Sequence, residues 1–380
     1  VTESEWALAS TDPEWVCRID GDPYEYADFH ILTTIDSQPD VCATQDTLPT
    51  DENNGQGVFC AQKDSTVRAI YDWNNAASYK LTWLSSVEQI GSRLEDGVVC
   101  GAAGRTTAGR CANQLKSGVK AFREMKGIGG SGIRALDVSN LTDMAYMFQG
   151  AKSFNEDLTQ WTTGNVKNMP YVFQNAQAFN QPLPWDTSKV EVMSYMFDKA
   201  YKFDQPLSDW ETTSVRLMRG MFQSAEDFNQ DLSAWANKLT QLQNMENMFK
   251  NASAFNNGSA PGASDQPLNW TAPNLGLMNY AFAYATSFNQ QIFADGASTT
   301  NVTNMSGMFK GATAFNQHIG GWNTQSLDKA ASMFEDATAF NKDIGNWSMG
   351  VVTNMNAMFK NAEAFNQDLS GWVLGKRAID

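Results

Sequence analysis

Apolar and polar residues recur in one fixed order, about 25 residues long, through the last two thirds of the chain. The clearest copy, residues 302–317, reads Val-Thr-Asn-Met-Ser-Gly-Met-Phe-Lys-Gly-Ala-Thr-Ala-Phe-Asn-Gln. Four apolar residues in it follow the i, i+3, i+4, i+7 spacing of one helix face: Met305, Met308, Phe309 and Ala312. This spacing predicts a short helix, and segment 315–319, which is apolar at both ends and polar between them, predicts a short strand.

The same order occurs nine times, and a second phenylalanine follows the first one six residues later in every copy. We number the repeats one to nine by their first phenylalanine: Phe148, Phe173, Phe197, Phe222, Phe249, Phe282, Phe309, Phe334 and Phe359. A fixed period of this length predicts a solenoid in which each coil, a helical turn plus a strand, stacks on the next coil. Stacking lets the repeats bury a continuous core that no single repeat could bury alone.

Two further residues recur with the phenylalanines. A tryptophan closes most of the repeats, at a corner where its ring can seal the gap between coils. An asparagine follows the second phenylalanine in every repeat except repeat three, which has Asp204 there. We interpret the asparagines as a ladder that satisfies backbone groups of the neighbouring coil rather than as a polar binding stripe.

The repeated sequence motifs Asn-Val-Thr-Asn-Met, Met-Phe and Phe-Asn-Gln, together with the recurring Trp, resemble those of the BspA-like leucine-rich repeat family, a bacterial surface protein repeat of about 26 residues. The resemblance covers roughly the last two thirds of the chain. It implies a leucine-rich-repeat-like solenoid on a secreted or surface-displayed protein, with adhesion as a role. It supplies no catalytic residues.

Residues 1–132 contain no repeat and are expected to form a separate N-terminal domain or cap, followed by the solenoid at 133–380 with an insertion at 256–276. All five cysteines precede the repeats: Cys17, Cys42, Cys60, Cys100 and Cys111. Because Cys-x-x-Cys is absent, disulfides in an oxidising compartment are favoured over a metal site. Two bridges would leave one thiol, and the pairing stays open. An amphipathic helix at Gln114–Lys126 is expected to cover the first coil.

Composition excludes several classes of function. The net charge of −15 argues against nucleic acid and anionic membrane as partners. No apolar run is long enough to span a bilayer, which predicts no direct membrane insertion. The two histidines lie outside any catalytic or zinc motif, and glycine-rich segments lack the residues of a phosphate-binding loop. We therefore expect no enzyme, no cofactor and no metal.

Candidate surface residues come from departures from the repeat and from exposed positions within it. The insertion is expected to form a loop on one face, either a binding loop or a tolerated excursion. The candidates for N-glycosylation are Asn257, Asn269, Asn140 and Asn346. A possible binding surface comprises Asp343, Asp368 and His318, which occupy one position of the repeat. An ordinary solvated face is the simpler interpretation of that row.

The leading hypothesis is an extracellular or cell-surface, non-enzymatic adhesion protein whose solenoid binds a protein or glycan on a cell surface or matrix. The first alternative is a structural subunit of an extracellular fibre, sheath or wall, in which the ends of solenoids add to one another in self-assembly. The second alternative is an enzyme restricted to the N-terminal domain, where a carboxylate pair such as Asp20 and Asp22 would do acid-base work.

Overall fold

The computed structural model describes most of the repeat region and parts of the chain before it. In full it describes residues 118–124, 133–134, 138–294 and 296–375, and it also describes the backbone of residues 131–132 and of four strands before residue 71. The chain divides into two compact units, Val1–Val166 and Lys167–Asp380. The second unit begins in repeat two, so each unit contains part of the repeat array.

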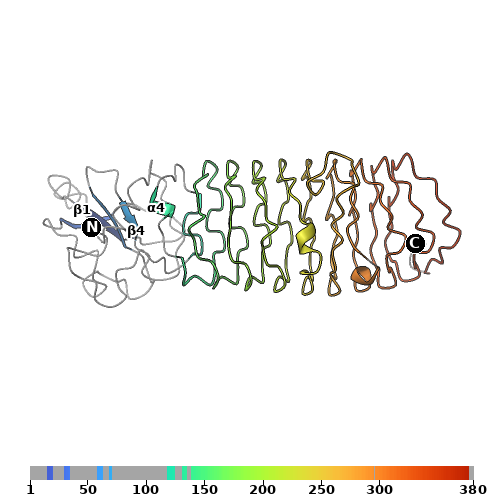
Figure 1. Cartoon of the computed structure of the whole chain (residues 1–380), viewed down its shortest axis with the longest axis horizontal. Helices are drawn as coiled ribbons and strands as arrows, with labels where there is room; N and C mark the ends of the chain where they lie inside the picture. The colour runs from blue at the N-terminus through green and yellow to red at the C-terminus, as the bar shows by residue number, and fades with distance from the viewer. Residues whose placement is uncertain are drawn as a thin grey trace. The chain divides into compact units, whose positions relative to one another are not determined.

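The first unit contains a four-stranded antiparallel sheet with the strand order β2-β1-β3-β4. Its strands are β1 (Trp15–Ile19), β2 (His30–Thr34), β3 (Val58–Gln62) and β4 (Arg68–Ile70). The register of β1 and β3 sets the backbone of Cys17 opposite that of Cys60. The same unit contains the helix α4 (Ser131–Arg134), labelled in Figure 1. Among the described residues, no helix combines the length and apolar content needed to cross a membrane.

The methionine–phenylalanine segment of each repeat is a run of tight turns, and the predicted helix is wrong. In repeat seven, Gly307 and Gly311 have φ values of 59° and 66°, a left-handed conformation that a right-handed helix cannot contain. The Met308 N–H donates to the Met305 carbonyl at 3.1 Å, which closes a four-residue β-turn. The equivalent left-handed residues of the second unit are Tyr171, Asn175, Tyr195, Lys199, Gly220, Ser224, Asn247, Asn251, Tyr280, Tyr284, Ser332, Asp336, Ala357 and Asn361.

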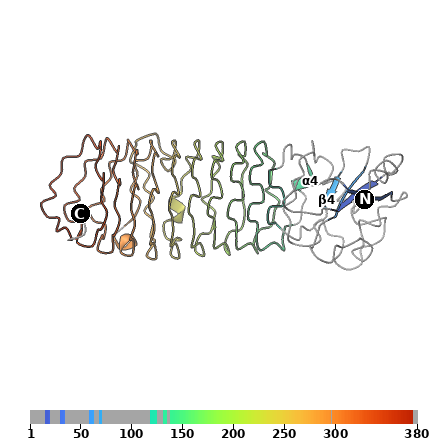
Figure 2. The same cartoon turned by 180° about the vertical axis from the view of Figure 1, so that it is seen from behind.

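These turns direct alternate N–H groups of one repeat toward the carbonyls of the next. The N–H groups of Met305, Gly307 and Phe309 donate to the repeat eight carbonyls of Lys329, Ala331 and Met333. The bonds measure 2.8, 2.8 and 2.9 Å. Figures 1 and 2 show the resulting row of coils in residues 167–375, each lying beside the next. Hydrogen bonds between repeats therefore replace the bonds that a helix would form within each repeat.

The core of the array consists of aromatic and methionine columns that pass from repeat to repeat. The rings of Phe309 and Phe315 stack within repeat seven at 3.8 Å between centroids, and Phe309 stacks on Phe334 of repeat eight at 5.8 Å. The predicted inward positions are confirmed, because Met305, Met308, Phe309 and Ala312 are all fully buried. The tryptophans close the core as expected, and the Trp347 indole N–H donates to the Ile319 carbonyl at 3.0 Å.

The strand predicted at 315–319 is absent, although Phe315 and Ile319 are buried as expected. Side chains join the repeats here. The Asn316 N–H donates to Asn289 Oδ1 at 2.8 Å, and the Asn341 N–H donates to Asn316 Oδ1 at 3.0 Å. In repeat three the Asp204 carboxylate replaces the amide and accepts from the Asn229 N–H. The asparagine ladder is therefore confirmed, and it explains why no backbone strand is needed at this position.

The first coil is covered as predicted, but not by a helix. Residues 118–124 repeat the turn geometry, with left-handed φ values at Lys120 and Glu124. The N–H groups of Lys120 and Phe122 donate to carbonyls of repeat one, and the Phe122 ring stacks on Phe148 at 5.2 Å. This segment is therefore a short rung of the array, and the amphipathic pattern predicted the burial of Phe122 without predicting the conformation.

Candidate binding surface

One isolated parallel bridge joins each successive pair of repeats in the second unit, and the bridging residues form a continuous row. We call it the ladder row: Asn168, Val192, Leu217, Asn244, Leu277, Asn304, Lys329 and Asn354. The bridging residues are half-buried or exposed, whereas the residue after each of them is buried in every repeat from two to eight. The row therefore presents one side chain per repeat to the surface.

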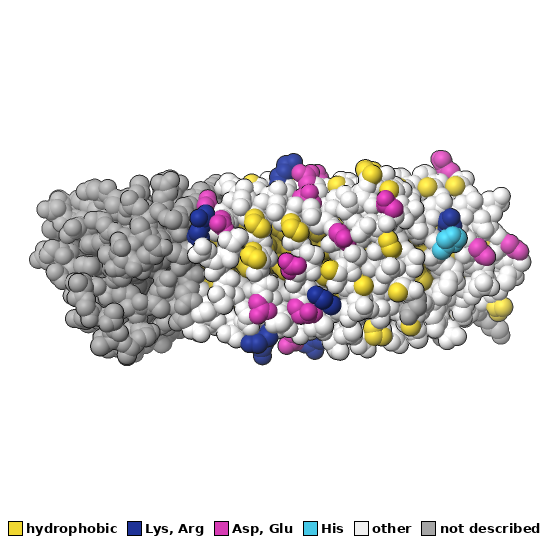
Figure 3. Space-filling model, viewed as in Figure 1, with side chains coloured by type: hydrophobic (Ala, Val, Ile, Leu, Met, Phe, Trp, Pro, Cys, Tyr) yellow, Lys and Arg dark blue, Asp and Glu magenta, His cyan; other side chains and the backbone are white. Residues whose placement is uncertain are grey.

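Aliphatic residues interrupt this row in repeats three, four and six, and those of repeats three and four are adjacent. Val192 bridges to Leu217, and the Leu217 side chain is 36% exposed. Three residues after the bridging position, Tyr171 and Tyr195 stack on each other at 5.0 Å and are half-buried. We call these four residues the ladder patch. Figure 3 shows hydrophobic side chains reaching the surface of the described residues among acidic and basic ones. Exposed apolar residues that share a surface row are typical of an interaction site.

Ion pairs flank the ladder patch. Arg216 contacts Glu191 at 2.8 Å, and Arg219 contacts Glu246 at 3.7 Å. The Arg219 guanidinium also lies 5.7 Å from the centroid of the Tyr195 ring. Burial raises the pKa of Tyr195, so its hydroxyl stays protonated at neutral pH. An apolar centre with tyrosine, arginine and a charged rim matches the composition of protein interfaces, while exposed ion pairs of this kind contribute little stability.

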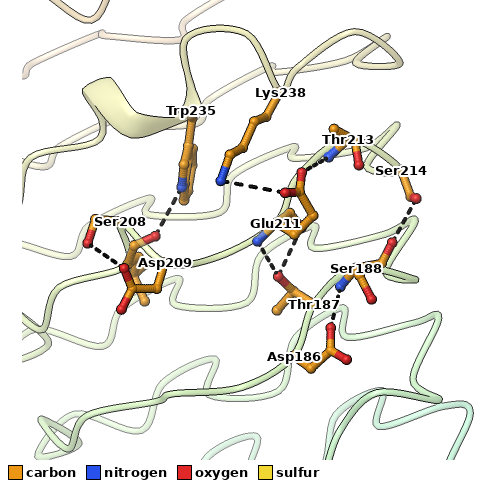
Figure 4. Close-up of polar contacts among 11 residues, drawn as sticks. Asp186, Thr187, Ser188, Ser208, Asp209, Glu211, Thr213, Ser214, Trp235 and Lys238 are labelled. Carbon is orange, nitrogen blue, oxygen red and sulfur yellow. Dashed lines mark hydrogen bonds and ion pairs between the residues drawn. The ribbon is translucent and has the colours of Figure 1, made fainter.

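Apart from the ladder patch, a cluster of polar residues follows the tryptophans of repeats two to four, as Figure 4 shows. Thr187 Oγ1 donates to the Glu211 carbonyl and accepts from the Glu211 N–H, both at 2.9 Å. Burial opposes ionisation of the Glu211 carboxyl, but hydrogen bonds from Thr213 and the charge of Lys238 lower its pKa. Because these side-chain oxygens join corners of successive repeats, the cluster is structural and offers no base poised for catalysis.

Two buried carboxylates lie in another row, directly after the first phenylalanine of their repeats. In the amide triad, Gln174 and Gln223 donate to Asp198 at 2.8 and 3.2 Å. In the lysine triad, Lys310 and Lys360 donate to Glu335 at 2.6 and 2.9 Å. Both carboxylates are nearly buried, and each is held by side chains from the repeats before and after its own.

The environment of these two carboxylates shifts their pKa values in opposite directions. Burial raises the pKa of Asp198, and the hydrogen bonds from the glutamines only partly oppose that effect. Hydrogen bonds from Lys310 and Lys360 lower the pKa of Glu335 to about 2. Both carboxylates are fully engaged by their neighbours, so the two triads hold repeats together rather than bind a substrate.

The predicted surface residues Asp343, Asp368 and His318 are all exposed. The Asp343 and Asp368 carboxylates accept from the N–H groups of Gly345 and Ser370, both at 2.8 Å. The bonds from Ser370 lower the pKa of Asp368. These aspartates therefore close turns at a solvated corner. Among the residues that the structure describes, no three histidine, cysteine, aspartate or glutamate side chains are grouped so that they could hold a metal ion.

The four glycosylation candidates differ in exposure. Asn140, Asn269 and Asn346 are exposed. Asn257 is fully buried, and its amide donates to the Gln266 carbonyl at 2.7 Å while its oxygen accepts from the Leu232 N–H at 2.7 Å. In the folded chain Asn257 has a structural role that the sequence alone did not reveal. Glycosylation itself stays a prediction.

The insertion at 256–276 is tied to the adjacent repeats. Buried Gln290 accepts from the Gln266 N–H and donates to the Ala263 carbonyl, at 3.0 and 2.8 Å. The Gly262 N–H donates to the Ser287 carbonyl at 2.8 Å. Of the two interpretations, these bonds favour a tolerated and well-anchored excursion over a binding loop.

The predicted cysteine sites lie in the part of the chain that is described least. Cys17 and Cys60 belong to β1 and β3, whose side chains lie outside the described residues. Cys42, Cys100 and Cys111 lie wholly outside them. The disulfides, and a disulfide-containing N-terminal domain, stay predictions.

Sequence reasoning missed the ladder patch. The signal was present, because Val192 and Leu217 occupy a position that is asparagine in most sister repeats. An aliphatic side chain at a position that is polar in the other repeats is either buried as part of the core or exposed as an apolar site on the surface. Only the exposure of Leu217 decides between them.

Comparison with known proteins identifies the repeats. Neither a curated protein nor a solved structure matches the chain. A family described as "Mycoplasma protein of unknown function, DUF285" matches three successive segments, residues 117–184, 183–294 and 276–378. The family matched is not the BspA-like leucine-rich repeat family, so that assignment is wrong. The three matches span more than half of the chain, which is therefore a repeat protein that belongs to the DUF285 family.

Proposed function

We propose that the repeats form a solenoid and that the protein is a non-enzymatic interaction module, which binds a protein partner on a cell surface or matrix through the ladder patch. The observation that carries this proposal is the exposed Leu217 beside Val192 in a row that is otherwise mostly polar. Stacked hydrogen bonds and continuous aromatic columns support the solenoid.

The chemistry of the patch favours protein over glycan as the partner. Val192 and Leu217 offer no hydrogen bonds to sugar hydroxyl groups, whereas they can enter an apolar pocket of a protein. Tyrosine and arginine, here Tyr195 and Arg219, are the residue types that dominate binding energy at protein interfaces. An extracellular location is supported by five cysteines within the first 111 residues.

The test compares two exposed aliphatic residues of the second unit. Leu217→Asp places a charge in the ladder patch, and the matched control Val351→Asp places one at a residue that is 53% exposed in repeat eight. The full chain and both variants are tested against immobilised collagen, fibronectin and laminin and against a glycan array. We expect saturable binding to a protein that Leu217→Asp weakens by about tenfold or more and Val351→Asp leaves unchanged.

The opposite results would sink the proposal. Equal loss in both variants would indicate a general charge effect, and binding to glycans alone would replace protein by glycan as the partner class. Circular dichroism of each variant checks that the fold is intact. An enzyme in the N-terminal region stays an alternative, because its residues lie outside those that the structure describes in full.

A second candidate function, a structural subunit of an extracellular assembly, is favoured by a different observation. The aromatic residues Phe359, Phe365 and Trp372 of repeat nine are only half-buried, whereas their counterparts in repeat eight are fully or almost fully buried. Light scattering after size exclusion under non-reducing conditions separates the two functions. Large particles support the structural subunit, and a single species near the chain mass of 41.9 kDa contradicts it.

A further inference from the structure

Tyr284, in repeat six, has the most exposed aromatic side chain among the residues that the structure describes in full, at 39%. Tyr280 and Tyr284 both have left-handed φ values, 56° and 60°, and lie four residues apart. A Cβ on Gly311 would lie 2.4 Å from the Tyr284 ring, and one on Gly307 would lie 2.1 Å from the Tyr280 ring. Each ring therefore lies against the backbone of a glycine in repeat seven, which restricts its movement before a ligand binds.

A lysine of repeat five lies beside this pair of tyrosines. Ala283, between the two tyrosines, offers only a methyl group, and its counterpart in repeat five is Lys250. The Asn251 N–H donates to the Ala283 carbonyl at 2.8 Å, which holds this part of repeat five against repeat six. The Lys250 ammonium lies 5.4 Å from the centroid of the Tyr280 ring. A positive charge therefore accompanies the aromatic rings.

This lysine has no carboxylate partner. No described residue forms an ion pair with Lys250 or a hydrogen bond with its side chain, whereas Lys310 of repeat seven bonds to Glu335 at 2.6 Å. The sequence from residue 251 to residue 309 contains no lysine or arginine, and its only acidic residues are Asp265 and Asp295. An anionic group would therefore meet an unpaired positive charge here, although the chain as a whole carries a net charge of −15.

The exposed residues around Tyr284 carry hydroxyl and amide groups. Asn251 occupies the position of Tyr284 in repeat five, and Ser253, Thr286 and Thr313 form an exposed row across repeats five to seven. The Thr286 and Thr313 hydroxyls each donate to a carbonyl of the preceding repeat at 3.4 Å, so their oxygens can still accept hydrogen bonds. This composition suits a sugar, whose C–H face packs on an aromatic ring while its hydroxyl groups bond to polar side chains around the ring.

The backbone of this segment favours a sugar over a peptide. The Tyr280 N–H donates to the Ser306 carbonyl at 2.9 Å, and the Tyr284 N–H donates to the Lys310 carbonyl at 2.6 Å. Because these N–H groups already bond to repeat seven, a peptide could not pair with them as an added strand. The site also differs from the ladder patch, whose centre is aliphatic.

We propose that Tyr280, Tyr284 and Lys250 form a second binding site, which takes an acidic sugar of a polysaccharide. The C–H face of the sugar ring packs on Tyr284, and the carboxylate or sulfate group of the sugar binds the Lys250 ammonium. The site lies in repeats five to seven and is independent of the ladder patch in repeats two to four.

The experiment uses the full chain and substitutions that sister repeats already contain. Tyr284→Asn introduces the residue that repeat five has at this position, and asparagine tolerates the left-handed φ. Lys250→Gln introduces the residue of repeat four. The matched control, Lys329→Asn, removes an exposed positive charge in repeat eight and introduces the residue of repeat seven. Circular dichroism checks that each variant is folded.

Binding is measured by isothermal titration calorimetry with oligogalacturonate, its neutral methyl ester, dextran sulfate and polyglutamate. We expect saturable binding of oligogalacturonate, dextran sulfate or both, and the result decides between a carboxylate and a sulfate as the anionic group. The methyl ester should bind at least about tenfold more weakly than oligogalacturonate if the group is a carboxylate. Tyr284→Asn and Lys250→Gln should each weaken binding by about tenfold or more, whereas Lys329→Asn and Leu217→Asp should leave it unchanged.

Absence of saturable binding to both acidic polysaccharides would overturn the proposal. Equal binding of polyglutamate, or equal losses in Lys250→Gln and Lys329→Asn, would also overturn it, because either result indicates a general attraction of anions. A loss in Leu217→Asp would move the sugar to the ladder patch and refute a separate site. Protein binding that Leu217→Asp weakens is a different measurement, so this proposal and the proposed function can fail independently.

Discussion

The amide triad and the lysine triad have the same architecture and opposite electrostatics. Each sets a nearly buried carboxylate between side chains from the preceding and following repeats. Asp198 faces two neutral amides, and burial raises its pKa. Glu335 faces two ammonium groups, and its pKa falls to about 2. The difference teaches that the neighbours about 25 residues away, and not the position within the repeat, decide what a carboxylate contributes.

The largest expected effect tests whether the cores beneath the two triads are equivalent. Phe197 and Phe334 directly precede Asp198 and Glu335, and both phenylalanines are fully buried. Phe197→Ala and Phe334→Ala should each lower the free energy of unfolding by about 3 to 5 kcal/mol, because each leaves a cavity in a stacked column. Urea unfolding followed by tryptophan fluorescence measures the loss.

The matched control for this pair is Phe359→Ala, in repeat nine, where the ring is only half-buried. We expect a clearly smaller loss there, because less buried surface is removed. If Phe197→Ala and Phe334→Ala differed by several kcal/mol, the cores would not be equivalent and the comparison of the triads would fail.

A smaller effect separates the triads themselves. Glu335→Gln removes the charge that Lys310 and Lys360 share, so we expect a loss of about 2 kcal/mol in the free energy of unfolding. Asp198→Asn removes a buried charge, while Gln174 and Gln223 can still form hydrogen bonds to an amide. That substitution should change the free energy of unfolding by less than about 1 kcal/mol. Equal losses in the two variants would contradict the conclusion that the neighbouring side chains decide how much each carboxylate contributes to stability.

The smallest effect is the pH dependence of the same two variants. The folded pKa of Glu335, about 2, lies below the ordinary value of 4.5. The contribution of Glu335 to the free energy of unfolding is therefore present above pH 4.5 and is lost as the pH falls toward about 2. For Asp198 the folded pKa is raised above 3.8. Its contribution to the free energy of unfolding is therefore present below that pH and is lost as the pH rises through the folded pKa.

Unfolding free energies at pH 7 and at pH 3 measure this dependence. The Glu335→Gln variant should lose less stability than the wild type on acidification, and the Asp198→Asn variant should lose more. A pH dependence identical to that of the wild type in both variants would show that neither pKa shift is linked to folding.

Much of the fold was predictable from the sequence, because repetition itself carries structural information. A residue that recurs at a fixed spacing occupies equivalent surroundings in each coil, which is why the buried phenylalanines and the asparagine ladder were predicted correctly. The helix was predicted wrongly because successive β-turns with left-handed residues place apolar groups on one side with nearly helical spacing. Gly307 hints at this geometry, but Tyr280 at the same position conceals it, since tyrosine seldom has a positive φ.

Two glycines at this left-handed position accommodate a tyrosine ring of the preceding repeat. A Cβ on Gly307 would lie 2.1 Å from the Tyr280 ring, so this glycine leaves room for the tyrosine ring of the preceding repeat. The Tyr195 ring stands in the same relation to Gly220. Such pairings join residues of neighbouring repeats and cannot be recognised within a single copy of the motif.

The sequence by itself determined the period, the number of repeats and the side chains that enter the core. These follow from the identity of residues and their spacing along the chain. The tertiary structure alone decided the backbone conformation, the exposure of Leu217, the burial of Asn257 and the opposite pKa shifts of Asp198 and Glu335. Each of these depends on contacts between residues that become neighbours only when one coil stacks on the next, and such contacts set burial and electrostatics.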